Sequence, residues 1–248
     1  MDEGKKSIEP EAVEKMGFLS RIAGIFFEPR KVFNFLNNKP SWFPAFILIL
    51  VISIIVAQII LPQSLLLQKE IVSQIPQLSS APPEVLDKIA EVDTAKRINS
   101  AVGEILKNLI GIFLLTSLVY FFCNIILGGD SRYKKVLSVV TYASFVPILG
   151  AVLKTPLIIV KNSADIQTSL ALLMPEGDVT KIRYLLLSFV DIFSIWEIIL
   201  IALGLTVLYK FTKGKAYTAS LISWLVLAIF GIGLSVLGMS ISGVPISW

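Results

Sequence analysis

Five long runs of apolar residues, separated by shorter polar segments, dominate the pattern of this chain. Each run has about the 20 residues that an α-helix needs to cross the hydrocarbon core of a bilayer, at about 1.5 Å of rise per residue. Helices are favoured there because lipid offers no hydrogen-bond partner to loose backbone groups. The pattern therefore predicts an all-α polytopic membrane protein with five transmembrane helices, at residues 43–61, 109–127, 136–160, 185–208 and 219–237.

Two segments outside these runs repeat apolar residues with helical spacing. Residues 18–38 carry such a face on both sides of Pro29, which predicts an interfacial amphipathic helix pair on the cytoplasmic leaflet, within an N-terminal region 1–42. A partner-binding amphipathic helix is the alternative. In the long loop 62–108, a second amphipathic helix is expected to open at Pro82-Pro83-Glu84 and to run directly into the second span.

The distribution of positive charge predicts the orientation of the spans. Of the 22 Lys and Arg residues, thirteen lie in region 1–42 and in the short hairpins 128–135 and 209–218, and eight lie in the loops on the other side. Short basic loops mark the cytoplasmic face. We therefore expect a plasma-membrane protein with a cytoplasmic N-terminus and an extracytoplasmic C-terminus. The net charge of +4 then reflects attraction to the membrane surface, and no nucleic-acid partner is expected.

Composition narrows the chemistry. Hydrophobic residues make up 55% of the chain, charged residues only 16%, and the mean hydropathy is +0.79. There is no histidine and a single cysteine, Cys123, which we interpret as a packing residue. Histidine-based triads, disulfides within the chain and the usual zinc sites are excluded, and no nucleophile elbow or phosphate-binding glycine loop is present. We therefore expect no catalytic, cofactor or metal-binding residue, and a protein that is not an enzyme.

Three ionisable residues fall inside the predicted spans: Lys154, Asp191 and Glu197. Each costs about 2.5–3.5 kcal/mol at the bilayer centre unless it finds a partner or a cavity. Lys154 and Asp191 each lie about six residues, or about 9 Å, from the outer end of their spans. We therefore predict a structural ion pair between the third and fourth helices, with Gln58 of the first span in the same layer. Snorkelling of Lys154 to the interface is the alternative.

Glu197 lies deeper, near the level of Thr116 and Ser117 in the second span. It is predicted to be hydrogen-bonded inside the bundle, and a proton-relay role is the alternative.

Small and helix-bending residues within the spans are predicted to serve packing. They are Tyr142, Ser144, Pro147, Gly150, Pro156 and Gly204. The pair Gly231 and Ser235 in the last span predicts a contact within the bundle, and a homo-oligomer face is the alternative.

An ordered set of short motifs runs through residues 20–237. These are Phe26-Phe27-Glu28-Pro29, Lys39-Pro40-Ser41-Trp42, Gly128-Gly129 with Lys134-Lys135, Tyr142-Ala143-Ser144-Phe145-Val146-Pro147, Asp191-Ile192-Phe193-Ser194-Ile195-Trp196 and Lys213-Gly214-Lys215-Ala216. With this set the chain resembles the Ypt/Rab-interacting (YIP-type) membrane protein family, in particular its prokaryotic branch. The positions that carry the resemblance are Pro29, Trp42, Gly128, Gly129, Tyr142, Pro147, Asp191, Trp196 and Lys215.

The resemblance implies a five-helix membrane scaffold without an established enzymatic activity. The function predicted is that of a non-enzymatic scaffold or an assembly or trafficking factor, which sits in the lipid bilayer and binds a partner membrane-protein complex. The alternative is a small transporter, channel or lipid-handling protein that uses Asp191, Glu197 and Lys154 in a polar path between helices.

Overall fold

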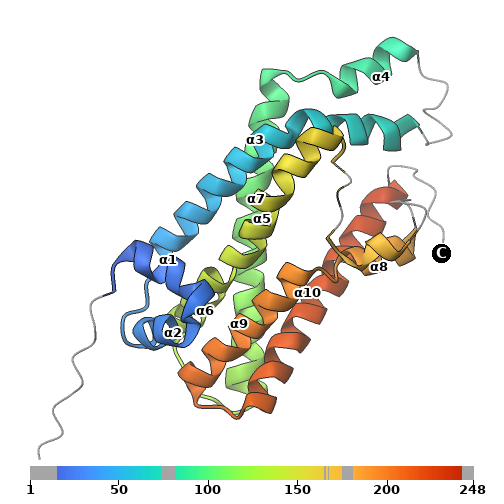
Figure 1. Ribbon diagram of the computed structural model, residues 1–248. Helices are drawn as coiled ribbons and strands as arrows, with labels where there is room; N and C mark the ends of the chain where they lie inside the picture. The colour runs from blue at the N-terminus through green and yellow to red at the C-terminus, as the bar shows by residue number, and fades with distance from the viewer. Residues whose placement is uncertain (1–15, 74–81, 165, 167, 175–180, 242–248) are drawn as a thin grey trace, which may run out of the picture.

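The computed structural model describes residues 16–73, 82–164, 166, 168–174 and 181–241, and five of its helical segments are long and apolar enough to cross a membrane (Figure 1). These segments are α3 (Phe43–Ser73), α5 (Thr94–Tyr120) continued by the π-helix η1 (Phe121–Ile126), α6 (Tyr133–Ala143) followed by α7 (Phe145–Lys161), α9 (Ile192–Tyr209) and α10 (Lys213–Ile241). The prediction of an all-helical protein with five membrane-length segments is confirmed.

The bundle has two distinct ends. At the basal end lie α1 (Phe18–Phe27), α2 (Pro29–Asn38) and the two short connections 127–132 and 210–212. At the distal end lie α4 (Pro83–Ala90) and the last turns of α3 and α7 (Figure 1). The five segments pass between these ends in alternating directions, as short antiparallel connections require.

The packing differs between the two halves of the bundle. The helix pairs in contact are α3 with α5 and α7, α7 with α9, α9 with α10, and α10 with α5, so that these five form a ring. In the basal half α6 fills this ring, and every residue from Val136 to Ala143 is buried. Gly204 of α9 allows this close approach, because a Cβ atom there would lie 2.3 Å from Cγ1 of Val139.

The N-terminal helix pair is docked on the bundle. Its residues Ile25, Val32, Phe33 and Leu36 are completely buried, and α2 packs against α9 and α6. The apolar face that was expected to lie on the leaflet therefore meets protein for much of its area. The periodicity identifies an apolar face but does not say whether lipid or protein covers it.

Two large apolar side chains of this helix pair are strongly exposed. Leu19 is 76% exposed and Phe27 is 84% exposed. They are the part of the pair left free to meet headgroups or a partner.

The long loop 62–108 is mostly helical. α3 continues to Ser73 and changes direction in its second half (Figure 1), where Pro62 removes a backbone donor. The expected single helix into the second span is wrong, because the chain breaks between α4 and α5 and Asp93 caps α5 by accepting from the backbone nitrogen of Lys96 at 2.8 Å. α4 folds back on α3, where Lys69 and Asp87 form a 2.6 Å ion pair.

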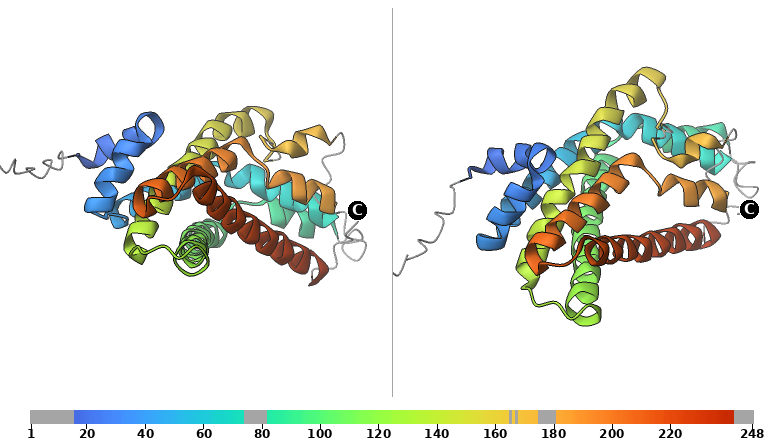
Figure 2. Two further views of the ribbon diagram at one scale, coloured as in Figure 1. Left: turned by 90° about the horizontal axis from the view of Figure 1, so that it is seen from below. Right: turned by 60° about the horizontal axis from the view of Figure 1, so that its bottom comes forward.

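α10 leaves the bundle half-way along its length. Its buried residues are Ala216, Ala219, Ser220, Ser223 and Ala228, and none of residues 229–241 is buried. Figure 2 shows the distal half of α10 diverging from α7. We call residues 229–241 the α10 arm.

Candidate functional site

The third predicted span is two helices, and the break between them shapes the interior. α6 ends at Ala143 and α7 begins at Phe145. Pro147 lies in the first turn of α7, where it has no N–H to donate to the carbonyl group of Ala143. At this break the chain leaves the centre of the ring and passes to its rim, where α7 packs on α3 and α9. The space above α6 is left as a cavity.

This cavity has a volume of about 360 Å³ and lies between α3, α5, α7, α9 and α10. Its basal limit is formed by Ser144 and Glu197, above the buried residues of α6. Glu104, Lys107 and Asn108 of α5 line its distal part, and a 2.5 Å ion pair joins Glu104 to Lys107. Most of the remaining wall is apolar, and it includes Val56, Ile60, Ile112, Leu115, Ile148 and Leu227.

Glu197 is the acid at the deep end of the cavity. The residue is only 9% exposed, and the hydroxyl of Ser144 donates to its Oε1 atom at 2.8 Å. The same hydroxyl lies 3.0 Å from the carbonyl oxygen of Val140. Because a hydroxyl has one proton, Ser144 donates fully to only one of these two oxygens, and a protonated Glu197 that donated to Ser144 Oγ would allow both contacts. Among the described residues Glu197 forms no ion pair.

The partner of Glu197 is therefore not in the second span. Thr116 Oγ1 donates to the carbonyl oxygen of Ile112 at 2.6 Å, and Ser117 Oγ donates to that of Phe113 at 2.8 Å. Both hydroxyls are thus bonded to their own helix, four residues back. The sequence offered a signal for Ser144, since it stands beside the proline that breaks the third span.

A third polar group lines the cavity from α3. Ser53 is 7% exposed, and its Oγ atom is buried without a hydrogen-bond partner among the described residues. Ser53 was not among the candidate residues predicted from the sequence. The available signal was that Ser53 and Gln58 are the two polar residues in the first apolar run.

The predicted contact between Lys154 and Asp191 is present. Nζ of Lys154 lies 3.8 Å from Oδ2 of Asp191, which also accepts a hydrogen bond from Thr168 Oγ1. The expected position of Asp191 inside a span is wrong, however. α8 (Ile182–Ser188) ends before it, and Asp191 caps α9 by accepting from the backbone nitrogen of Phe193 at 2.8 Å. An aspartate at a helix N-terminus satisfies backbone donors that would otherwise be unpaired.

Gln58 has a different partner from the one expected. Its Nε2 atom donates to the carbonyl oxygen of Arg97 at 3.0 Å, and Nη1 of Arg97 lies 3.4 Å from its Oε1 atom. Gln58 thus connects α3 to the first turns of α5. Neither Gln58 nor the pair of Lys154 and Asp191 lines the cavity, so the three ionisable residues do not form one polar path in the described structure.

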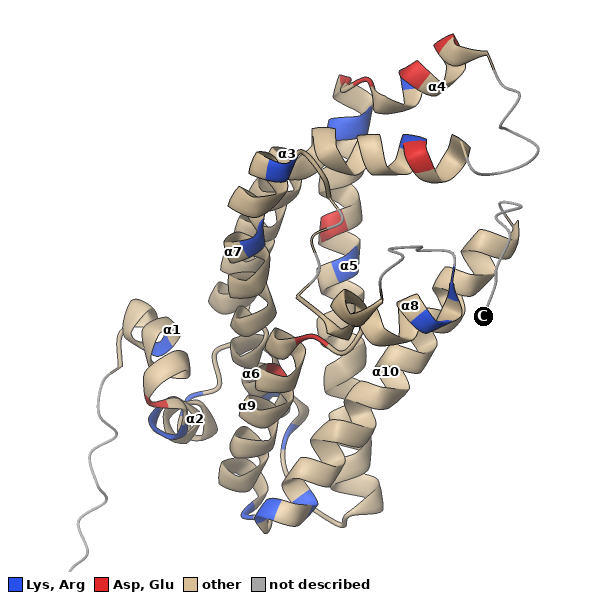
Figure 3. Cartoon of the chain, turned by 45° about the vertical axis from the view of Figure 1, so that its right-hand side comes forward, with Lys and Arg blue, Asp and Glu red and all other residues tan. Residues whose placement is uncertain are grey.

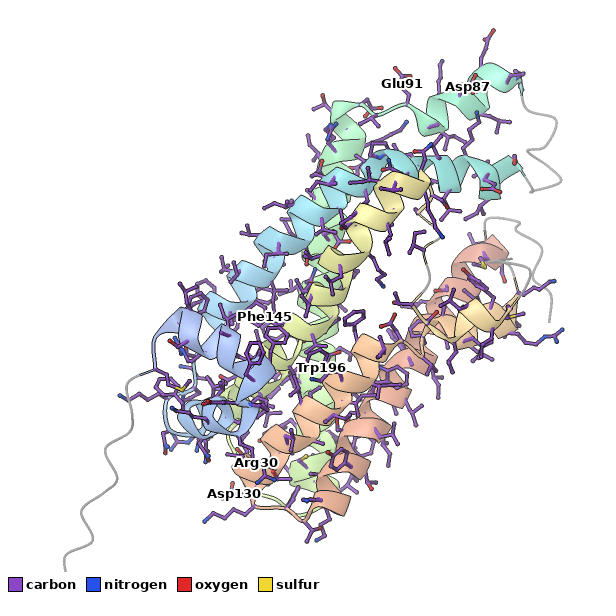
Figure 4. All side chains as sticks on the ribbon, in the orientation of Figure 1. Arg30, Asp87, Glu91, Asp130, Phe145 and Trp196 are labelled. Carbon is purple, nitrogen blue, oxygen red and sulfur yellow. The ribbon has the colours of Figure 1, made fainter. Side chains whose placement is uncertain are left out.

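Three of the family-motif residues lie in or beside the N-terminal helices or join neighbouring helices through aromatic contacts. Pro29 opens α2. The ring centroid of Trp42 lies 5.6 Å from that of Phe113, and Trp196 lies 5.8 Å from Phe26. Figure 4 shows Trp196 on the side of α9 that faces α1 and α2.

Tyr142 of α6 lies at the interface with α1 and α2. It is completely buried, and the guanidinium carbon of Arg21 lies 5.9 Å from its ring centroid and 5.1 Å from that of Phe35. Such cation–π contacts favour a charged guanidinium among aromatic rings.

The remaining motif residues shape turns and helix ends. Gly128 has a φ of +65°, which glycine adopts without steric cost, and a Cβ atom on Gly129 would lie 2.5 Å from the Tyr209 ring. Pro147 lines the cavity beside the helix break, and Lys215 is exposed in the first turn of α10. The motifs thus map to the docking of α1 and α2, to one basal turn and to the floor of the cavity.

Five membrane-length helices around a cavity that holds a buried acid define a multi-pass helical membrane protein. The family model of the Yip1 domain matches residues 23–235, and the chain belongs to this family. It is also similar to the membrane protein YknW of Bacillus subtilis (strain 168), with 27% identity over 218 residues that cover 85% of this chain and 88% of YknW. No solved structure matches the chain. The family resemblance predicted from the motifs is confirmed.

Proposed function

We propose that this Yip1-family protein is a non-enzymatic scaffold or assembly factor of the cell membrane, and that it binds a partner membrane-protein complex through the α10 arm. The observation that carries this proposal is the loss of internal packing along α10 beyond Ala228. The arm has apolar side chains such as Phe230, Leu234 and Leu237, all more than half exposed.

Small residues on the arm also support a protein partner over lipid alone. Helices associate in membranes through close van der Waals packing, and small residues at the interface allow it. Gly204 is used in this way inside the bundle, whereas a Cβ atom at Gly233 or Gly238 would meet no atom of the described residues within 4 Å. The internal contact expected in the last span is limited to Gly231, where a Cβ atom would lie 3.1 Å from Phe189.

The proposed orientation places the basal end in the cytoplasm. Figure 3 shows lysines and arginines gathered around the basal turns with few acids among them, while α4 and the distal end carry both signs. Arg30 and Asp130 mark the basal end in Figure 4, and Asp87 and Glu91 mark the distal one. An excess of positive charge in short loops favours retention on the cytoplasmic side. The exposed Leu19 and Phe27 would then insert among headgroups next to α1 and α2.

Photocrosslinking in native membranes tests the docking role of the arm. A photoreactive phenylalanine derivative at Leu234, which is 54% exposed, is expected to yield a discrete crosslinked protein of defined mass. The matched control is the same group at Ile55 of α3, which is 52% exposed. Ile55 is expected to crosslink to lipid without a discrete protein band.

The proposal is contradicted if, in native membranes, the photoreactive group crosslinks only to lipid at both positions. Equal crosslinking of one protein at Leu234 and Ile55 would also contradict it, because the arm would then have no preference. A crosslinked dimer of this chain would instead assign the arm to self-association.

A second candidate function has a specific observation in its favour. The cavity brings a buried acid next to apolar walls, which is typical of small-molecule sites. A polar path through Asp191, Glu197 and Lys154 is not supported, because Glu197 alone of these three lines the cavity. The buried residues of α6 also close the bundle below Glu197. Ligand binding at Glu197 is the version of this alternative that the geometry favours.

A further inference from the structure

The cavity is lined by polar groups that lack sufficient partners, and Ser53 is the most basal of the α3 residues that line it. Ser53 Oγ is buried without a hydrogen-bond partner in the described part of the chain, and it comes from α3. Glu197, from α9, uses its Oε1 atom in the contact with Ser144. These groups belong to separate helices, and all three residues line one cavity.

An ionised acid in such a place would be expensive, and protonation of Glu197 avoids this cost while the cavity is empty. Burial of an ionised carboxylate is offset only by a nearby positive charge or by several hydrogen bonds. Lys107, which lines the cavity, is already paired with Glu104. Lys154 of the neighbouring helix α7 is already paired with Asp191. The charge that would match Glu197 is therefore one that a ligand brings.

The size and the walls of the cavity limit what that ligand can be. A cavity volume of about 360 Å³ is near the lower limit of ligand pockets, which are about 300–1,000 Å³, and suits a small molecule. The walls between the floor and Glu104 are mainly aliphatic. A lipid acyl chain would place its apolar tip against Glu197, Ser144 and Ser53, which would cost hydrogen bonds without replacing them.

We propose that the cavity is a binding site for a small lipophilic amine, whose nitrogen meets Glu197 and the hydroxyls of Ser53 and Ser144 while its apolar body fills the space between α3, α5 and α7. The amine enters as the neutral base and takes the proton of Glu197, so that an ammonium–carboxylate pair forms. Ser144 then donates to Oε1 of Glu197, and Ser53 gains a partner. This site is independent of the α10 arm and of the scaffold role proposed above.

Binding is tested with the full chain in nanodiscs of neutral phosphatidylcholine, with 2-phenylethylamine as the probe. The thermal-unfolding midpoint is expected to rise in a saturable way, because a ligand that binds the folded state stabilises it. The matched neutral probe is 2-phenylethanol, which has the same apolar body and lacks the basic nitrogen. It is expected to bind at least about 10-fold more weakly, equivalent to about 1.4 kcal/mol.

One pair of variants tests the location of the site. Gly111 lines the cavity, and a Cβ atom there would meet nothing within 4 Å among the described residues, so that Gly111→Leu adds side-chain volume to the wall of the cavity. Gly103 lies two turns earlier on α5, is exposed and has equally open surroundings, so that Gly103→Leu is the control. Stabilisation by the amine is expected to vanish in Gly111→Leu and to persist in Gly103→Leu.

A second pair tests the role of charge. Glu197→Gln keeps the size and a donor for Ser144, and it is expected to lose at least about 10-fold in apparent affinity for the amine. Glu70→Gln removes the same charge at an exposed position of α3 and is expected to bind normally. The proposal is overturned if the amine stabilises Gly111→Leu or Glu197→Gln as much as the native chain. It is also overturned if 2-phenylethanol matches the amine or if the amine gives no saturable shift.

Discussion

The contact between Gly204 and Val139 should limit the stability of the basal half of the bundle. A Cβ atom on Gly204 would lie 2.3 Å from Cγ1 of Val139, 3.1 Å from its Cγ2 and 3.3 Å from its Cβ. Val139 is completely buried at the centre of the ring, so it has no free space to enter. Extra methyl groups in a well-packed core cost about 1–3 kcal/mol. Gly204→Ala should incur this cost.

The same substitution also has a favourable effect that must be separated from the clash. Replacement of glycine by alanine inside a helix stabilises the helix by up to about 1 kcal/mol. Gly103→Ala on α5 should show that gain alone, because a Cβ atom there meets nothing within 4 Å. The difference between the two variants, about 1–3 kcal/mol, then measures the clash.

Equilibrium unfolding in mixed micelles with increasing SDS provides the measurement. Tryptophan fluorescence reports the transition, since Trp42 and Trp196 pack at aromatic contacts in the folded state. The double variant Gly204→Ala with Val139→Ala should recover part of the loss, with a coupling free energy of at least about 1 kcal/mol. Strict additivity of the two single variants, or equal stability of Gly204→Ala and Gly103→Ala, would refute the reasoning.

Three further predictions concern the buried acid Glu197, the N-terminal cap of α9 and the orientation in the membrane. Glu197→Gln should unfold within about 1 kcal/mol of the native chain in the same SDS titration, whereas Glu197→Lys should lose several kcal/mol because it buries a cation without a partner. Asp191→Ala should be less stable than Asp191→Asn by about 1 kcal/mol, because asparagine still caps α9, and equal stabilities would argue against the cap. Reporter fusions after Lys134 and Lys213 should report the same face of the membrane and a fusion after Lys88 the opposite face; any other assignment would contradict the topology.

The number and the approximate positions of the membrane helices were predictable because the hydrophobic effect and the need for backbone hydrogen bonds decide them together. An apolar run of sufficient length has no better solvent than lipid, and its backbone has no better partner than itself. All five runs accordingly appear as helical segments in the structure. Their ends were harder to place, as α3 shows by continuing past Leu61 to Ser73.

Interruptions of the helices inside the apolar runs depend on single residues, which the mean hydropathy of a run does not reveal. Ser144 and Pro147 divide the third run, and Asp191 caps the last part of the fourth. Depth counted along a straight helix therefore placed Glu197 level with Thr116 and Ser117 but did not identify Ser144, which donates to it. The same counting still found the pair of Lys154 and Asp191, because α7 is intact through Lys154 and the break lies at Asp191 itself.

The docking of α1 and α2 illustrates a different limit. Their apolar periodicity is equally suited to a lipid surface and to a protein surface. The choice is made by tertiary partners such as Trp196, which meets Phe26 from a position far along the chain. Ser53 was missed for a related reason, since a lone serine gains meaning only when helices from elsewhere close a cavity around it.

The shortness of α9 creates a hydrophobic mismatch on one side of the molecule. Its 18 residues span about 27 Å, slightly less than a typical hydrocarbon thickness of about 30 Å. The leucines of the short helix η2 (Leu170–Leu173) extend the apolar surface beyond the start of α9, with Leu172 67% and Leu173 76% exposed. The bilayer next to α9 is therefore expected to be slightly thinner than around the rest of the protein.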